Sequence, residues 1–456
     1  MTTRPRTLWA SALCLAILVL LMNVLPGSLS ATNWSTIGHE VVSDTSTASS
    51  FQPSIAVGDD GVVHVVWSDS SALLGAGTGS DIFYRSRTAA GWGTLELVSQ
   101  DTNASSVRPQ VVVAPNGSVH VAWEQSGNVL SSDADIDIFY RMRNADGWGA
   151  MEVVSTESDW NSVDPAMAVG PNGSVHVVWA DGSDISFIGS TSDIVHKMRT
   201  ADGWTDSTVV STSLEDSLSA DVAVDDDNVV YVVWNDEGDI LSADDDWDVF
   251  LREFTDSWGP LTLISNGSAN ASQLASIAVT EAGTVHVVWQ ENTDKDSFIA
   301  DDILHRSRLN GEWSAIQVVS EGCDGESSAP DIASYDDEVH VVWEDFSDIL
   351  GSGGDLDVFY RVLSGDKWGL VSVVSTESDS SSDTPVIAVE DGKTHIVWAD
   401  SSDFDLGAGV NVIYKATPDA EVSEQGFPYW ILLLVVILVA VGYVAKRRLD
   451  ENNELS

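Results

Sequence analysis

The pentapeptide VHVVW constrains the fold of this chain more than any other feature. It stands at residues 63–67 and returns at 175–179, 285–289 and 339–343, with close copies at 119–123, 230–234 and 394–398. The tryptophans that end these seven copies are 56, 56, 55, 55, 54 and 55 residues apart. A fixed period of this length indicates a repeat architecture, in which each unit buries its apolar face against its neighbours.

Each unit contains four apolar stretches of strand length. In the first unit they are residues 53–57, 63–67, 81–87 and 91–99, and Val, Ile, Tyr, Phe and Trp dominate them. Asn-Gly and Asp-Gly turns separate such stretches, as at residues 116–117 and 202–203, and helical periodicity is absent from residue 32 to residue 420. The sequence therefore predicts an all-β fold, a seven-bladed β-propeller of four-stranded blades.

The two ends of the repeat region predict how the ring closes. The seventh unit lacks a fourth strand, whereas residues 33–43 are an isolated copy of one. In this copy Trp34 matches Trp92 and Glu40 matches Glu96. We therefore expect the N-terminal strand to complete the last blade.

A histidine recurs inside the pentapeptide, and it has two interpretations. A metal site needs several ligands that converge on one point. These histidines occur once per blade on a strand that is not innermost, so we expect them to be spread around the ring as buried, hydrogen-bonded residues. They are His64, His120, His176, His286, His340 and His395, with Tyr231 in the fourth copy.

The composition and the chain ends predict where the protein works. The 456 residues carry a net charge of −51, which excludes nucleic acid as a partner. Residues 1–31 resemble a secretory signal peptide, with a retained membrane anchor as the alternative. After the propeller (32–415) and a linker (416–427), residues 428–445 predict one transmembrane helix, and the basic start of the tail (446–456) marks its cytoplasmic side. The expected protein is thus a single-pass membrane protein with its propeller outside.

The repeat resembles the propellers of the sialidase superfamily with their Asp-box (BNR) motifs. The resemblance covers nearly all of residues 33–415 and lies in a strand ending in Trp, a strand such as DIFYRSR (81–87) and a turn such as RNADGWG (143–149). These turns lack the Ser and Thr of a full Asp box, so the boxes are degenerate. The resemblance implies the propeller fold, and it is poor grounds for activity.

Sialidase chemistry, as this family implies it, needs three arginines for the substrate carboxylate, a Tyr–Glu nucleophile pair and an Asp that acts as the acid. Only Arg108 lies between blades, in the sequence VRPQ, and one arginine cannot form the triad. The other arginines of the propeller lie on the repeated third strands, where a structural or surface role is expected. They are Arg85, Arg87, Arg141, Arg143, Arg199, Arg252, Arg306, Arg308 and Arg361.

Acidic residues recur in the loops that join the second and third strands, at two, five and fourteen positions past the tryptophan. Several carboxylates at one bend suit Ca²⁺, which takes six to eight oxygen ligands. The alternative is that these residues cap turns on a solvated acidic rim. The candidate calcium ligands are Asp181, Asp184 and Asp193, then Asp236, Asp239 and Asp248, then Asp345, Asp348 and Asp357.

The sequence is compatible with three functions. The first is a cell-surface binding or adhesion module that holds a glycan or a protein, with Arg108, Trp160 and Trp247 as candidate ligand contacts. The second is a sialidase-like glycoside hydrolase with a diverged site, and the third is a structural component of the cell envelope. Because no nucleophile–base pair is visible, the binding module is favoured over an enzyme.

Overall fold

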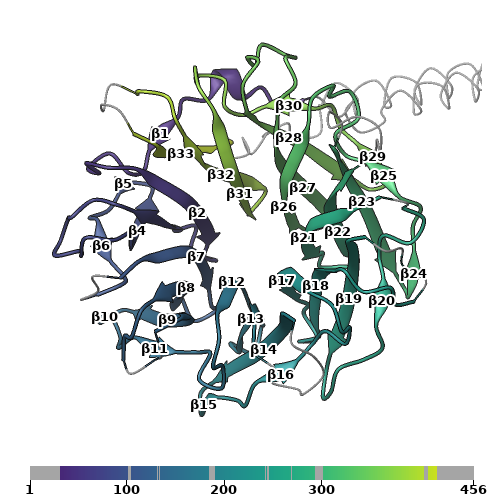
Figure 1. The fold of residues 1–456 in the computed structure, drawn as a ribbon. Coiled ribbons are helices and arrows are strands. Elements are labelled where there is room, and N and C mark those ends of the chain that lie inside the picture. Colours follow the sequence, from purple (N-terminus) through teal and green to yellow (C-terminus); the bar gives the residue numbers. More distant parts are fainter. Residues whose placement is uncertain are drawn as a thin grey trace, which may run out of the picture. The chain divides into compact units, whose positions relative to one another are not determined.

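The computed structural model describes residues 31–418, apart from 101–103, 131, 133, 184–190, 242, 244–245, 269, 293–300 and 405–408. In these residues seven antiparallel sheets are arranged in a ring, which confirms the predicted seven-bladed propeller (Figure 1). In every sheet the strands follow one another in chain order from the axis outward, except in the sheet that joins the two ends of the propeller.

The inner three strands of each blade are long and regular. The innermost are β2 (Ser50–Val57), β7 (Ser106–Val113), β12 (Ser162–Val169), β17 (Ser217–Val224), β21 (Ser272–Val279), β26 (Ser327–Tyr335) and β31 (Ser382–Glu390). The second strands are β3 (Val63–Asp69), β8 (Val119–Ser126), β13 (Val175–Asp181), β18 (Val230–Asp236), β22 (Val285–Asn292), β27 (Glu338–Asp345) and β32 (Lys393–Asp400). The third are β4 (Asp81–Thr88), β9 (Ile136–Asn144), β14 (Asp193–Thr200), β19 (Asp248–Phe254), β23 (Asp301–Leu309), β28 (Asp357–Ser364) and β33 (Asn411–Ala416).

The outer strand is not the single fourth strand that the sequence predicts, because in most blades it pairs in two short pieces. In the first blade Trp92 pairs with Arg87 and Leu97 pairs with Phe83, so the register shifts by one residue between them. A one-residue bulge of this kind is common at sheet edges. The pieces are β5 (Gly91–Trp92) and β6 (Glu96–Leu97), β10 (Gly147–Trp148) and β11 (Glu152–Val153), β15 (Gly203–Trp204) and β16 (Thr208–Val209), β20 (Thr262–Leu263), β24 (Glu312–Trp313) and β25 (Gln317–Val318), and β29 (Lys367–Trp368) and β30 (Ser372–Val373).

The N-terminal segment closes the ring, as predicted. Strand β1 (Glu40–Val41) pairs with β33 and completes the last blade. Trp34 lies in a short 3₁₀ helix, η1 (Trp34–Thr36), rather than in a strand. Its ring nevertheless contacts Tyr360 of the preceding blade edge-on at 5.4 Å, as Trp92 contacts Tyr414 at 5.3 Å.

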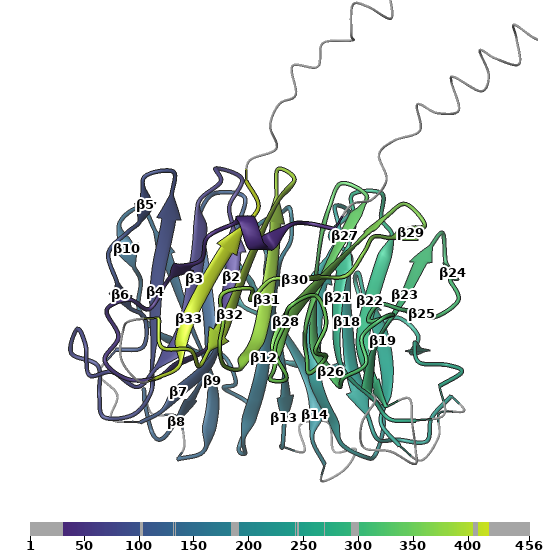
Figure 2. The same ribbon diagram turned by 90° about the horizontal axis from the view of Figure 1, so that it is seen from above.

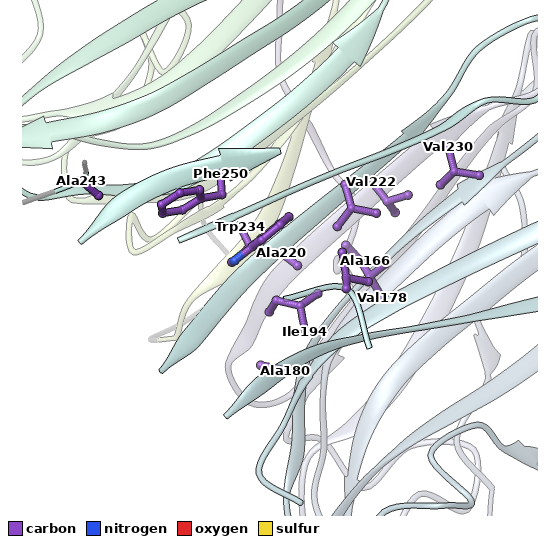
Figure 3. Close-up of a cluster of buried hydrophobic side chains, with 12 residues drawn as sticks. Ala166, Val178, Ala180, Ile194, Ala220, Val222, Val230, Trp234, Ala243 and Phe250 are labelled. Carbon is purple, nitrogen blue, oxygen red and sulfur yellow. The ribbon is translucent and has the colours of Figure 1, made fainter. Parts of the chain in front are cut away.

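The core lies between the blades, and the repeated tryptophans are at its centre. Trp234 is fully buried and packs with Phe250 against residues of the preceding blade such as Val178 and Ile194 (Figure 3). The second strands are buried along nearly their whole length because both of their faces are covered. This explains why VHVVW is apolar at almost every position.

One basic side chain per blade connects its third strand to the outer strand of the preceding blade. Arg85 donates from Nη1 to the carbonyl of Val42 and from Nε to the carbonyl of Gly93, both at 2.9 Å. These bonds confirm a structural role for five of the nine repeated arginines. The first bond recurs from Arg141 to Val98, Lys197 to Val154, Arg252 to Val210, Arg306 to Ile264, Arg361 to Val319 and Lys415 to Val374.

The repeated histidines are buried and hydrogen-bonded, as expected. His64 Nδ1 lies 2.7 Å from the hydroxyl of Tyr84 on the third strand. Burial lowers the pKa of His64 to about 4, so it is neutral at physiological pH. The same bond joins His120 to Tyr140, His340 to Tyr360 and His395 to Tyr414, and in two blades an imidazole Nε2 replaces the hydroxyl, in the pairs His176 with His196 and His286 with His305.

The two faces of the propeller differ. One face, called the loop face below, carries the connections between blades and those between second and third strands; there Ser50 pairs with Asp69 and Asp69 with Asp81. Helix η1 and the end of β33 lie at the other face (Figure 2). No helix among the described residues is long and apolar enough to cross a membrane, and the predicted signal peptide (1–31, of which only residue 31 is described) and spanning segment (428–445) lie essentially outside them.

Candidate binding site at the mouth of the central channel

The innermost strands begin around the open mouth of a central cavity of about 360 Å³ on the loop face. Each strand has a bulge there, and one residue of the bulge adopts a left-handed conformation with φ between 46° and 52°. Seven residues, one per blade, thus form a ring that we call the mouth ring. They are Gln52, Arg108, Asp164, Ser219, Leu274, Ala329 and Thr384.

The mouth ring varies although the strands that carry it are repeated. Every innermost strand begins with a buried serine whose hydroxyl bonds the second strand, as Ser50 bonds Asp69 at 2.7 Å. The mouth ring, in contrast, has a different residue type in each blade. Since the architecture requires none of these side chains in particular, the asymmetry of the mouth is available for recognition of a ligand.

Arg108, the predicted ligand contact, lies in this ring and is paired with two carboxylates. Its Nη1 lies 3.1 Å from both carboxylate oxygens of Glu124, and its Nε lies 3.1 Å from Asp164 Oδ1. Although burial opposes it, the two carboxylates raise the pKa of Arg108. Glu124 is almost fully buried, and its Oε1 also accepts the backbone N–H of Asp164 at 2.8 Å. The positive charge of Arg108 is therefore already neutralised.

The opposite part of the mouth is also acidic. Glu344 accepts hydrogen bonds from the backbone N–H of Thr384 at 2.8 Å and from the hydroxyl of Ser328 at 2.9 Å. Burial, together with the charge of Glu344, raises the pKa of the adjacent Asp383 to about 6. Arg108 is the one basic residue among those that line the cavity, so the mouth favours neutral or cationic ligands.

Two aspartates that the sequence analysis missed line the cavity wall. The hydroxyl of Ser276 lies 2.9 Å from Asp221 and 3.2 Å from Asp331, and each carboxylate also accepts a backbone N–H of the following blade. Burial chiefly, and also the nearby Asp221, raise the pKa of Asp331 to about 7. Because Ser276 has one hydroxyl proton, both contacts are hydrogen bonds only when one of the carboxyl groups is protonated.

The two predicted tryptophans lie in different environments. Trp160, in the connection before β12, is 63% exposed and covers Gly182. Trp247 is half-buried beside β19, and its carbonyl accepts the N–H of Ser272 at 2.7 Å. Neither residue lines the central cavity. Of the three predicted ligand contacts, only Arg108 does.

The predicted calcium ligands two positions past the tryptophan are buried hydrogen-bond acceptors. Asp181 accepts from Trp179 Nε1 at 2.8 Å and from Ser162 at 3.0 Å. Asp236 and Asp345 accept from the equivalent tryptophans and serines. These carboxylates therefore hold the first and second strands of the blade together.

The aspartates fourteen positions past the tryptophan are buried too, and each accepts from a serine that ends the outer strand. The distances are 2.8 Å for Asp193, 2.5 Å for Asp248 and 2.6 Å for Asp357. Asp239 and Asp348 are exposed, and Asp184 lies outside the described residues. Among the described residues no group of three or more His, Cys, Asp or Glu could hold a metal ion, and a calcium site in these loops stays a prediction.

Solved structures share this fold. An ulvan lyase, the PL25 enzyme bound to -[GlcA(1-4)Rha3S]-, is 10% identical with a TM-score of 0.55, over 82% of this chain and 95% of that chain. The polysaccharide lyase Uly1 is 11% identical with a TM-score of 0.52, over 84% and 100%. The Hadza microbial sialidase Hz136 is 12% identical with a TM-score of 0.45, over 67% and 65%. No protein-family model matches the chain, and no curated protein matches its sequence. The similarity to the two lyases thus confirms the propeller fold.

Proposed function

We propose that this protein is an exported, membrane-anchored propeller that binds a neutral glycan at the mouth of its channel. The apolar segments at residues 1–31 and 428–445 support export and anchoring. A cavity with many hydrogen-bonding groups and an asymmetric rim supports recognition of a polyhydroxylated ligand.

The observation that carries this proposal is the pairing of Arg108. An arginine attracts a ligand carboxylate through its positive charge, yet Glu124 and Asp164, which contact Nη1 and Nε of Arg108, already balance that charge. An acidic sugar would also have to approach Glu344 and Asp383. A sialic acid or a uronic acid is therefore disfavoured, and neutral sugars remain.

Isothermal titration of the chain with neutral and acidic oligosaccharides tests the proposal. We expect binding of a neutral oligosaccharide and none of its uronate-containing or sialylated counterparts. Ala329→Gln narrows the mouth with the side chain that Gln52 presents at the equivalent place, so the fold should tolerate it while affinity falls at least tenfold. Tighter binding of the acidic sugars, or unchanged affinity of Ala329→Gln, would contradict the proposal.

The pair of Asp221 and Asp331 favours glycoside hydrolysis as a second candidate function. Glycosidases use two carboxyl groups, one of which stays protonated near neutral pH and acts as the general acid. The pKa of Asp331, at about 7, suits that role. Release of sugar from neutral polysaccharides by the native chain, with loss of activity in Asp331→Asn, would support an enzyme; the absence of any release would leave the binding module.

Export and anchoring need a separate experiment. In intact cells the propeller should be degraded by added protease, while the tail after residue 445 should be protected. Recovery of the protein from the soluble cytoplasmic fraction would contradict this part of the proposal.

A further inference from the structure

Blade three (β12–β14) and blade six (β26–β28) each carry one exposed aromatic side chain at the same place on the loop face. Trp160 is 63% exposed and Phe346 is 48% exposed. Trp160 lies in the connection that precedes the innermost strand, two residues before Ser162, whereas Phe346 follows the second strand, three residues after Trp343. They come from different segments of the repeat, which hides their relation in the sequence.

A backbone hydrogen bond that recurs in all seven blades shows that the two places are equivalent. In blade three the N–H of Gly182 donates to the carbonyl of Asn161 at 2.9 Å, and in blade six the N–H of Phe346 donates to the carbonyl of Glu326 at 3.1 Å. The residue that precedes the acceptor residue in the sequence is Trp160 in blade three and Gly325 in blade six. The aromatic residue and the glycine have therefore exchanged places.

The glycine allows the close approach in both blades. A Cβ at Gly182 would lie 2.5 Å from Trp160 Cδ1, and a Cβ at Gly325 would lie 2.4 Å from the backbone nitrogen of Ser347 and 2.5 Å from the carbonyl carbon of Phe346. In the other five blades this pair of positions contains no aromatic residue and no glycine. Those pairs are Ala48 with Ser70, Ala104 with Ser126, Glu215 with Glu237, Asn270 with Asn292, and Ser380 with Ser401.

Near each aromatic residue a serine hydroxyl holds the backbone of an exposed aspartate. Ser183 accepts the N–H of Asp159, and Ser347 accepts that of Asp324, at 2.9 and 2.8 Å. Both aspartates are exposed, and Asp159 directly precedes Trp160. A flat ring with an adjacent hydrogen-bond acceptor suits a sugar, whose C–H groups pack on the ring while its hydroxyls donate to the acid.

The two aromatic residues belong to blades on opposite sides of the mouth. Blade three (β12–β14) and blade six (β26–β28) lie on opposite sides of the channel (Figure 1). Trp160 is also close in the chain to Asp164 of the mouth ring. A linear ligand that spans from one aromatic side chain to the other would pass over the mouth.

We infer that Trp160 and Phe346 are two stacking platforms for one extended, neutral polysaccharide chain that crosses the mouth of the channel. This inference rests on the proposed glycan binding and names its ligand class, a β-linked glucan. β-Linked glucose has equatorial substituents, so both faces of each sugar expose the axial C–H groups that an aromatic ring contacts. Binding at two platforms makes the affinity depend on chain length, because the second contact is intramolecular.

The test uses the full chain and β-linked glucose oligomers from two to eight units. Trp160 is the one tryptophan among the described residues that is more exposed than buried, so quenching of its fluorescence by acrylamide reports on this platform. We expect the octamer to protect Trp160 from quenching and to bind at least tenfold more tightly than the dimer. Phe346→Trp adds an equivalent reporter at the second platform, which the octamer should also protect.

Alanine variants separate this inference from the proposed function. Trp160→Ala and Phe346→Ala should each weaken octamer binding about tenfold, and in both variants the advantage of the octamer over the dimer should disappear. Leu370→Ala, which removes a 65% exposed side chain at the outer edge of blade six, is the matched control and should change nothing. If neither platform variant weakens octamer binding, the inference is wrong and the proposed function still stands. If only one variant weakens it, the claim that one polysaccharide chain crosses the mouth and contacts both platforms is wrong. If no neutral oligosaccharide binds at all, both fail.

Discussion

Replacing Asp181 with asparagine tests how the repeated acidic residues of the blades act. The side chain of Asp181 is fully buried, and four donors surround it. Oδ2 accepts from Trp179 Nε1 at 2.8 Å and from Ser162 at 3.0 Å, and Oδ1 accepts from the hydroxyl of Ser158 at 3.0 Å and from the N–H of Ser183 at 2.9 Å. Asparagine has the same shape but only one acceptor oxygen.

Blade two indicates which contacts survive the replacement. There Gln125 occupies this position, and its amide oxygen accepts from both the tryptophan and the serine, at 3.2 and 2.8 Å. In Asp181→Asn the amide NH₂ would then face Ser158, whose hydroxyl can turn to accept, and the N–H of Ser183, which cannot. One lost charge-assisted hydrogen bond and one unsatisfied buried N–H together cost about 4 kcal/mol of unfolding free energy.

Urea unfolding at fixed ionic strength, with 1 mM Ca²⁺ or with EDTA, measures this cost. We expect the same loss of about 4 kcal/mol in both solutions, since the donors belong to the protein. Asp239→Asn, on an exposed residue of an equivalent loop, should change the free energy by less than about 0.5 kcal/mol. A loss below about 1 kcal/mol for Asp181→Asn would refute the hydrogen-bond reasoning. A loss confined to the calcium solution would show that the carboxylate acts as a metal ligand.

Three further predictions concern other parts of the propeller. Leu350 has a φ of 56° and is 67% exposed, so Leu350→Asn should raise the unfolding free energy by about 1 kcal/mol, and a lower urea midpoint would contradict this. Arg141 is 5% exposed and donates to the carbonyls of Val98 and Gly149, so Arg141→Met should cost about 2–4 kcal/mol by the same measurement, and a neutral effect would show that the inter-blade bond is dispensable. Burial lowers the pKa of His340 to about 4. The contribution of neutral His340 to the free energy of unfolding is therefore full above pH 6.5, and it decreases by about 3 kcal/mol as the pH falls to 4. Stability that stays flat between pH 6.5 and 4 would contradict the buried neutral histidines.

The fold could be predicted from the sequence because every blade buries the same apolar strands between its neighbours. A second strand covered on both faces must be apolar throughout, so VHVVW and its period already predicted stacked blades. The isolated copy of the outer strand at residues 33–43 predicted the closure, which the pairing of β1 with β33 confirms. Trp34 differs in local structure only, since it reaches the same position from a 3₁₀ turn.

The site was predictable only in part. Arg108 stood out because it is the arginine outside the third strands, and it does line the mouth. The mouth ring left a weaker signal, a variable residue, often followed by proline, within an otherwise repeated strand. Asp221 and Asp331 left no signal in the sequence. Their carboxyl groups meet only in the folded ring, where Ser276 of the blade between them contacts both.

The sequence by itself determined the number of blades, their strand order and their closure, because burial of repeated apolar strands is a local requirement that each unit carries in its own residues. Only the tertiary structure decided what the acidic and aromatic residues contact. Asp181 and its equivalents turned out to be enclosed by donors from neighbouring strands, and the equivalence of Trp160 and Phe346 became visible through a shared backbone bond. Such contacts depend on the closed ring, which brings separate segments of the chain to one face and one axis.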